Sequence, residues 1–242
     1  MTDTGRNALI ENIKTNPADN ILNTLTTLDT ERITEIGREY IARAIRHISN
    51  SPDEIITLIT NPNVIKTLTT LANQDNNKIG RQLIAIAIFN ISRINTVKDA
   101  ILANINENPT DNILKALTTM ANQNNTPFGL QYIARAIFNI STTDARRDTL
   151  ITNIKENSDN NILKALTTLA TKVKTPLGIE LIAGAIANIS TTDAGRDTLI
   201  ANITENSDNN IKKALTTMAN QENTKLGREL IAVIKKNLNL HY

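Results

Sequence analysis

The sequence has no cysteine and no tryptophan, and aromatic residues make up 2% of its 242 residues. Without cysteine the chain cannot form disulfides, zinc–thiolate sites, iron–sulfur clusters or a cysteine nucleophile. Three phenylalanines and three tyrosines are too few to fill a core, so the core must be aliphatic. The hydrophobic share of 40% is sufficient for a folded protein and excludes wholesale disorder.

An excess of one charge and long apolar runs are also missing. The 26 basic and 24 acidic residues give a formal net charge of +2, which provides no broad electrostatic attraction for duplex DNA or an anionic membrane. No segment approaches the roughly 18 apolar residues of a transmembrane helix, and the first residues have no apolar run of signal-peptide type. We expect a soluble, cytoplasmic protein; the alternative is secretion as a host-interacting factor.

The residue patterns of common catalytic sites are absent from the sequence. His47 and His241 are the only histidines, which excludes a Ser-His-Asp triad and an HExxH zinc site. A phosphate-binding loop of the GxxxxGK type and a calcium-loop pattern are missing. Single carboxylates recur at an equivalent position of the third helices, as Glu39, Glu180 and Glu229, which solvated helix faces explain. We therefore expect a protein that is not an enzyme and that has no cofactor and no metal site.

Internal repetition is the strongest signal that is present. The string Leu-Thr-Thr followed by Leu or Met starts at residues 25, 68, 117, 166 and 215, at intervals of 43, 49, 49 and 49. A glycine follows each string at a fixed offset, at positions 37, 80, 129, 178 and 227. These periods divide a single domain, 1–242, into repeats of about 1–49, 50–92, 93–141, 142–190 and 191–242.

The fourth repeat shows the secondary structure of one unit. Apolar residues at helical spacing predict a first helix over 144–156 and a second over about 160–171. Pro176 suits the first turn of a third helix, which is the most apolar of the three and should be the most buried. We interpret the repeated glycine of the third helix as a point of close packing against a neighbouring helix; a ligand contact is the alternative. Because one such unit cannot bury its apolar face alone, the repeats should stack as an all-α solenoid.

The strings IARAIFNIS at 133–141 and IAGAIANIS at 182–190 resemble the third helix of an armadillo repeat. The segments RRDTLITNI and NILKALTTLA resemble its first and second helices. The resemblance implies a right-handed α-solenoid of five tandem three-helix armadillo-like repeats. The units here are longer than that family's usual repeat and lack its third-helix tryptophan. The two-helix HEAT solenoid is the runner-up.

The resemblance also implies a site, because armadillo proteins bind extended peptides in a concave groove lined by third helices. A third-helix asparagine bonds the peptide backbone there, since its amide offers both a donor and an acceptor. The matching residues here are Asn90, Asn139, Asn188 and Asn237, with His47 in the first repeat. In the alternative interpretation these asparagines bond or cap adjacent helices.

Helical spacing identifies the neighbours of these asparagines. Arg43 and Arg135 lie four residues earlier on the same face, and Arg46, Phe89 and Phe138 immediately precede the asparagine position. This predicts a cationic groove with aromatic anchors over the first three repeats, suited to a partner with acidic and apolar residues. The missing tryptophan argues against basic nuclear-localisation peptides as ligands. Phe89 and Phe138 could instead be ordinary core residues.

These features favour a non-enzymatic scaffold that binds a protein or an extended peptide. The first alternative is a structural or self-assembling array, a homodimer through an end face, because Leu238 and Leu240 follow the last helix without an obvious polar cap. A nucleic-acid-binding solenoid is the weaker alternative, because the basic residues form no stripe in the sequence.

Overall fold

The computed structural model describes residues 3–16, 24, 33–50, 63–108, 112–156, 161–205 and 210–240, and these residues form α-helices joined by loops and turns. The expected second helix of the first repeat and first helix of the second repeat lie mostly outside the described residues. Each of the last three repeats shows the expected three helices. The first helices are α1 (Asp3–Thr15), α7 (Asn95–Glu107), α10 (Asp144–Glu156) and α13 (Asp193–Glu205). The second helices are α5 (Asn63–Asn73), α8 (Ile113–Asn122), α11 (Ile162–Lys172) and α14 (Ile211–Ala219). The third helices are α3 (Glu35–Ile48), α6 (Lys78–Ser92), α9 (Pro127–Ile140), α12 (Pro176–Ile189) and α15 (Lys225–Asn237).

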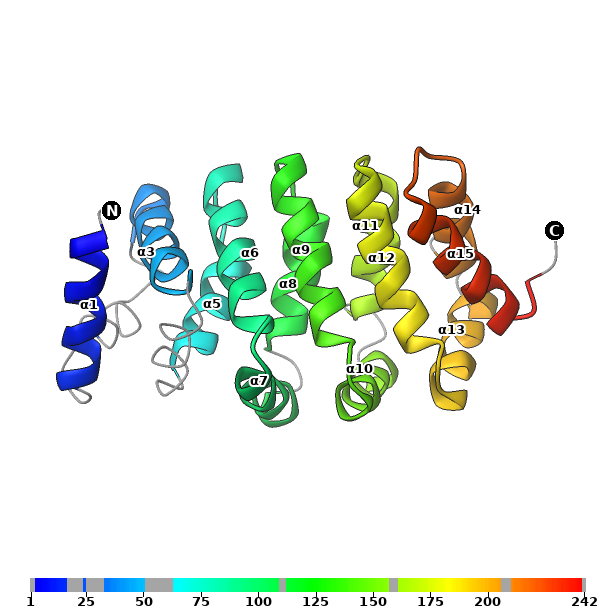
Figure 1. The fold of residues 1–242 in the computed structure, drawn as a ribbon, viewed down its shortest axis with the longest axis horizontal. Coiled ribbons are helices and arrows are strands. Elements are labelled where there is room, and N and C mark those ends of the chain that lie inside the picture. Colours follow the sequence, from blue (N-terminus) through cyan, green and yellow to red (C-terminus); the bar gives the residue numbers. More distant parts are fainter. Residues whose placement is uncertain are drawn as a thin grey trace.

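Helices of the same kind stack on one another along the length of the molecule (Figure 1). The third helices α3, α6, α9, α12 and α15 stand side by side as one row, and each contacts the next. The second helices α5, α8, α11 and α14 form a row behind them, and α7, α10 and α13 form a third row along one edge. Helix α1 lies at the N-terminal end, beside α3. The predicted all-α solenoid of repeats is therefore confirmed.

Each third helix begins with the same hydrogen-bonded turn. The residue before the helix is Thr or Asn, and its side-chain oxygen accepts a hydrogen bond from the backbone N–H of the repeated glycine. Pro127 and Pro176 occupy the first turn, as predicted. A Cβ at Gly178 would collide with the side chain of Val173 in the preceding loop. The close approach at Gly178 therefore comes from the helix's own loop, whereas a Cβ at Gly129 would lie 3.5 Å from the backbone of Gln82 in the neighbouring helix α6, as expected.

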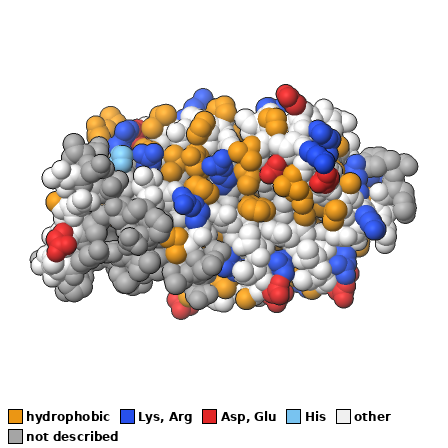
Figure 2. Space-filling view, in the orientation of Figure 1, with side chains coloured by type: hydrophobic (Ala, Val, Ile, Leu, Met, Phe, Trp, Pro, Cys, Tyr) orange, Lys and Arg blue, Asp and Glu red, His pale blue; other side chains and the backbone are white. Residues whose placement is uncertain are grey.

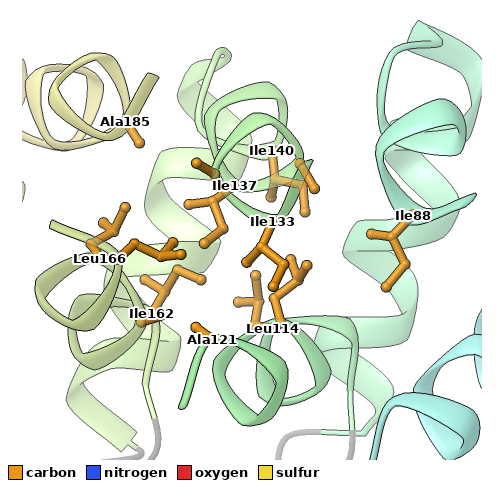
Figure 3. Close-up of a cluster of buried hydrophobic side chains, with 14 of the residues drawn as sticks. Ile88, Leu114, Ala121, Ile133, Ile137, Ile140, Ile162, Leu166 and Ala185 are labelled. Atoms are coloured by element: carbon orange, nitrogen blue, oxygen red, sulfur yellow. The ribbon is translucent and has the colours of Figure 1, made fainter. Parts of the chain in front are cut away.

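The core runs through the array between the rows of second and third helices. In Figure 3, Ile133 and Ile137 of α9 point toward Leu114 of α8 and toward Ile162 and Leu166 of α11. These side chains are at most 1% exposed. Burial of each is worth roughly 1.5–3 kcal/mol, and most of the partners belong to another helix row or another repeat. The core is aliphatic, as the composition required.

A row of hydrogen bonds links the C-terminal ends of consecutive third helices. In four repeats the third-helix asparagine donates its amide N–H to the hydroxyl of the serine that ends the previous third helix. The pairs are Asn90 to Ser49 (3.2 Å), Asn139 to Ser92 (3.1 Å), Asn188 to Ser141 (3.0 Å) and Asn237 to Ser190 (3.1 Å). Each serine is fully buried, and its hydroxyl donates to a carbonyl of its own helix three residues earlier. The four bonds are called the asparagine–serine ladder below.

We expect Asn188→Ala to lower the free energy of unfolding, because the variant loses one inter-repeat hydrogen bond of about 1 kcal/mol. Asn106→Ala is the matched control, since Asn106 is exposed on α7 and the change brings the same gain in helix propensity. Urea denaturation followed by circular dichroism measures both. Equal stability of the two variants would show that the ladder does not contribute.

Candidate functional site

The solvent-facing sides of α3, α6, α9, α12 and α15 form one continuous surface, called the third-helix face below (Figure 2). Hydrophobic side chains gather on it, with basic side chains between them. The apolar residue before the repeated glycine is exposed in all five repeats, an arrangement that the sequence analysis missed. These residues are Ile36 (63% exposed), Ile79 (44%), Phe128 (59%), Leu177 (39%) and Leu226 (51%). Their fixed place before the glycine was a signal that could have found them.

The third-helix face is bordered at its N-terminal end by a second set of inter-repeat hydrogen bonds. The residue two positions after the repeated glycine is Glu or Gln, and in three repeats it accepts a bond from the capping side chain of the next third helix. Asn77 donates to Glu39 (3.0 Å), Thr126 donates to Gln82 (2.6 Å) and Thr224 donates to Glu180 (2.5 Å). Because both the glutamate and the glutamine accept this bond, the charge at the position is free to vary without loss of the contact.

The predicted groove asparagines lie at the other end of the face. Asn90 is buried, whereas Asn139, Asn188 and Asn237 are half-buried. Each uses one amide hydrogen in the asparagine–serine ladder, which is the adjacent-helix role given above as the alternative. An asparagine amide has a second hydrogen and a carbonyl oxygen, so the ladder occupies part of its bonding capacity.

Phe89 is the centre of a cluster of aromatic and arginine side chains where α6 and α9 meet. Its ring centroid lies 5.3 Å from that of Tyr132, which in turn lies 5.8 Å from that of Phe128. The guanidinium carbon of Arg135 lies 5.6 Å from the centroid of Phe89 and 5.3 Å from that of Tyr132. Arg93, just past the end of α6, also lies 5.6 Å from the centroid of Phe89. We call these five residues the aromatic–arginine cluster.

Phe138 contacts the third helix of the following repeat. A Cβ added to Gly184 of α12 would lie 2.7 Å from the ring of Phe138, so the missing side chain of the glycine makes room for that ring. Both Phe138 and Phe89 are half-buried and pack against the aliphatic core. Each phenylalanine therefore packs in the core and also borders the third-helix face, so the interpretations as core residue and as surface aromatic both apply.

Arg43 occupies in α3 the position that Arg135 occupies in α9, and it has a partner within its own helix. Its guanidinium lies 2.8 Å from a carboxylate oxygen of Glu39, one helical turn earlier. This hydrogen bond, with the one that Asn77 donates, lowers the pKa of Glu39 from its ordinary value. Arg46 and His47, the other basic residues predicted for this end of the face, are half-buried on α3.

We expect Arg43→Ala to raise the pKa of Glu39 toward the ordinary glutamate value. The lowered pKa means that the ion pair contributes to stability at neutral pH, and that this contribution is lost as the pH falls through the pKa of Glu39 in the folded protein. NMR titration of the glutamate side-chain carboxyl carbons measures both pKa values. A Glu39 pKa that is the same in both proteins would contradict the ion pair.

A pocket lies outside the third-helix face. It lies between the loops at 122–127 and 171–175 and is bordered by Lys172, whose ammonium donates to the carbonyls of Ala121, Asn122 and Gln123 at the end of α8. Burial lowers the pKa of Lys172. The residues that the structure describes contain no cluster of three or more His, Cys, Asp or Glu side chains able to hold a metal ion.

Leu238 and Leu240 suggested a homodimer through an end face, and the apolar runs of the sequence suggested that no helix crosses a membrane. Leu238 is 4% exposed, and Leu240 packs against the same core, so both contribute to the protein's own interior. Among the described helices, none combines the length and the apolar character needed to cross a membrane.

Two solved structures share the fold. One is an engineered protein, with a TM-score of 0.63 and 20% identity, over 91% of this chain and 80% of that chain. The other is a designed armadillo repeat protein in complex with the peptide (KR)4, with a TM-score of 0.63 and 18% identity, over 95% of this chain and 85% of that chain. No protein-family model and no curated protein matches the sequence. The chain therefore has an armadillo-like fold, as its third-helix strings indicated.

Proposed function

We propose that this armadillo-like solenoid is a non-enzymatic scaffold that binds a protein segment or an extended peptide on its third-helix face. The observation that carries the proposal is the row of exposed apolar side chains, one per repeat, beside the arginines of the same face. Exposed apolar side chains gathered on one face are typical of an interaction site. A designed armadillo repeat protein of the same fold is in complex with a peptide, which supports a peptide ligand.

The side chains of the face favour a ligand that contains apolar and acidic residues. Ile79, Phe128 and Leu177 offer apolar contacts, and Arg135 offers positive charge, while Arg43 on the same face is paired with Glu39. The peptide of the designed protein alternates Lys and Arg, and we infer that the ligand here has the opposite charge.

The half-buried asparagines of the face are suited to bind the backbone of the ligand. Asn139, Asn188 and Asn237 each retain one amide hydrogen beyond the bond that they donate in the ladder, together with their carbonyl oxygen. We infer that these groups bond the peptide units of an extended ligand. Arg46, His47 and Phe138 border the same end of the face, and Asn90 contributes through the ladder.

A peptide of alternating Glu and Leu, (Glu-Leu)4, serves as the probe, with fluorescence anisotropy as the measurement. The double variant Ile79→Ser with Leu177→Ser removes two exposed apolar contacts and should weaken binding about thirtyfold, since each apolar side chain contributes on the order of 1 kcal/mol. Both side chains are exposed in the free protein, so the fold should be retained.

Ile200→Ser is the matched control. Ile200 is 41% exposed, close to the 44% of Ile79, but it lies on the first helix α13, away from the third-helix face. We expect the control to bind (Glu-Leu)4 as the unaltered protein does. Equal binding by the double variant, or no binding by the unaltered protein at millimolar peptide, would contradict the proposed function.

A further inference from the structure

Two equivalent arginines on the third-helix face differ in the residue one helical turn before them. Arg43 of α3 follows Glu39 by four residues and forms an ion pair with it. Arg135 of α9 follows Gln131 by four residues, so the same position before it carries no charge. The neutral residue leaves Arg135 without the partner that its equivalent has. Among the residues that the structure describes, Arg135 forms no ion pair.

Arg135 is instead held by aromatic rings, at 5.6 Å from the centroid of Phe89 and 5.3 Å from that of Tyr132. A guanidinium that stacks on a ring uses its face, and the N–H groups along its edge remain available for hydrogen bonds. The rings therefore fix the position of the charge without neutralising it. This differs from Arg43, whose guanidinium already donates to a carboxylate.

Arg93 places a second guanidinium at the same ring, 5.6 Å from the centroid of Phe89. Arg93 is exposed, and in the described part of the chain it has no carboxylate partner either. Two guanidiniums at one ring concentrate positive charge at this place on the surface, which favours a bound anion. A carboxylate matches the paired N–H groups of a guanidinium, and the exposed ring of Phe128 borders the cluster through Tyr132.

We propose that the aromatic–arginine cluster is a subsite for an acidic side chain of the bound segment, with an apolar neighbour of that side chain packed on Phe128. This inference rests on the proposed function and specifies where the ligand's negative charge lies. In the first repeat the equivalent arginine, Arg43, already forms an ion pair with Glu39 and is therefore not available to a ligand carboxylate. The acidic side chain of the ligand therefore aligns with the third repeat, because Gln131 leaves Arg135 available whereas Glu39 pairs with Arg43.

The test adds the missing internal partner and leaves both arginines in place. Gln131→Glu gives Arg135 a carboxylate at the spacing of the pair between Glu39 and Arg43. We expect binding of (Glu-Leu)4 at 150 mM salt to weaken about tenfold. Binding of the neutral peptide (Gln-Leu)4 should be unchanged. Gln82→Glu is the matched control, because the residue four positions after Gln82 is Ile86; its effect should be under about twofold.

The converse variant is Glu39→Gln, which frees Arg43. Its fold should be retained, because Gln82 shows that glutamine accepts the capping bond at this position. We expect it to bind (Glu-Leu)4 several-fold more tightly than the unaltered protein. If Gln131→Glu weakens binding of the acidic and the neutral peptide equally, or of neither, the subsite is refuted. The proposed function would survive that result as long as the double variant at Ile79 and Leu177 still loses binding.

Discussion

The hydrogen bond from each third-helix asparagine to the serine of the previous repeat fixes how consecutive third helices align. Apolar packing between helices is strong but not directional, so it tolerates small shifts along the helix axis. A buried hydroxyl that donates to its own helix and accepts from the next helix has one place where both bonds form. The capping bonds to Glu39, Gln82 and Glu180 hold the other ends of the same helices.

This alignment produces the third-helix face and its aromatic–arginine cluster. Arg135 reaches the ring of Phe89 only because α9 sits against α6 in the register that Asn139 and Ser92 define. The ring of Phe138 meets Gly184 in the same way one repeat later. Residues of the third helices thus both align consecutive repeats and form the third-helix face. The chemistry of the face then varies from repeat to repeat through single substitutions, such as glutamate for glutamine, that keep the structural contact.

The sequence predicted the elements well and their partners poorly. The repeat period and the proline of the first turn correctly placed the third helices, because these features depend on local periodicity. The partner of Asn139 is Ser92, in another repeat, and no spacing within a helix reveals such a contact. The contrast between Glu39 before Arg43 and Gln131 before Arg135 was visible in the sequence as a spacing of four residues. The sequence did not reveal that the rings of Phe89 and Tyr132 hold Arg135, because Phe89 belongs to another helix.

The most direct test of this account follows the arginine side chains themselves while a ligand binds. NMR of the guanidinium Nε–H groups gives separate signals for Arg135, Arg93 and Arg43 once each is assigned by substitution with lysine. When (Glu-Leu)4 is added, the account predicts that the signals of Arg135 and Arg93 shift, and that the signal of Arg43 stays in place because Glu39 already occupies it. An equal shift of all three signals, or a shift of Arg43 alone, would contradict it.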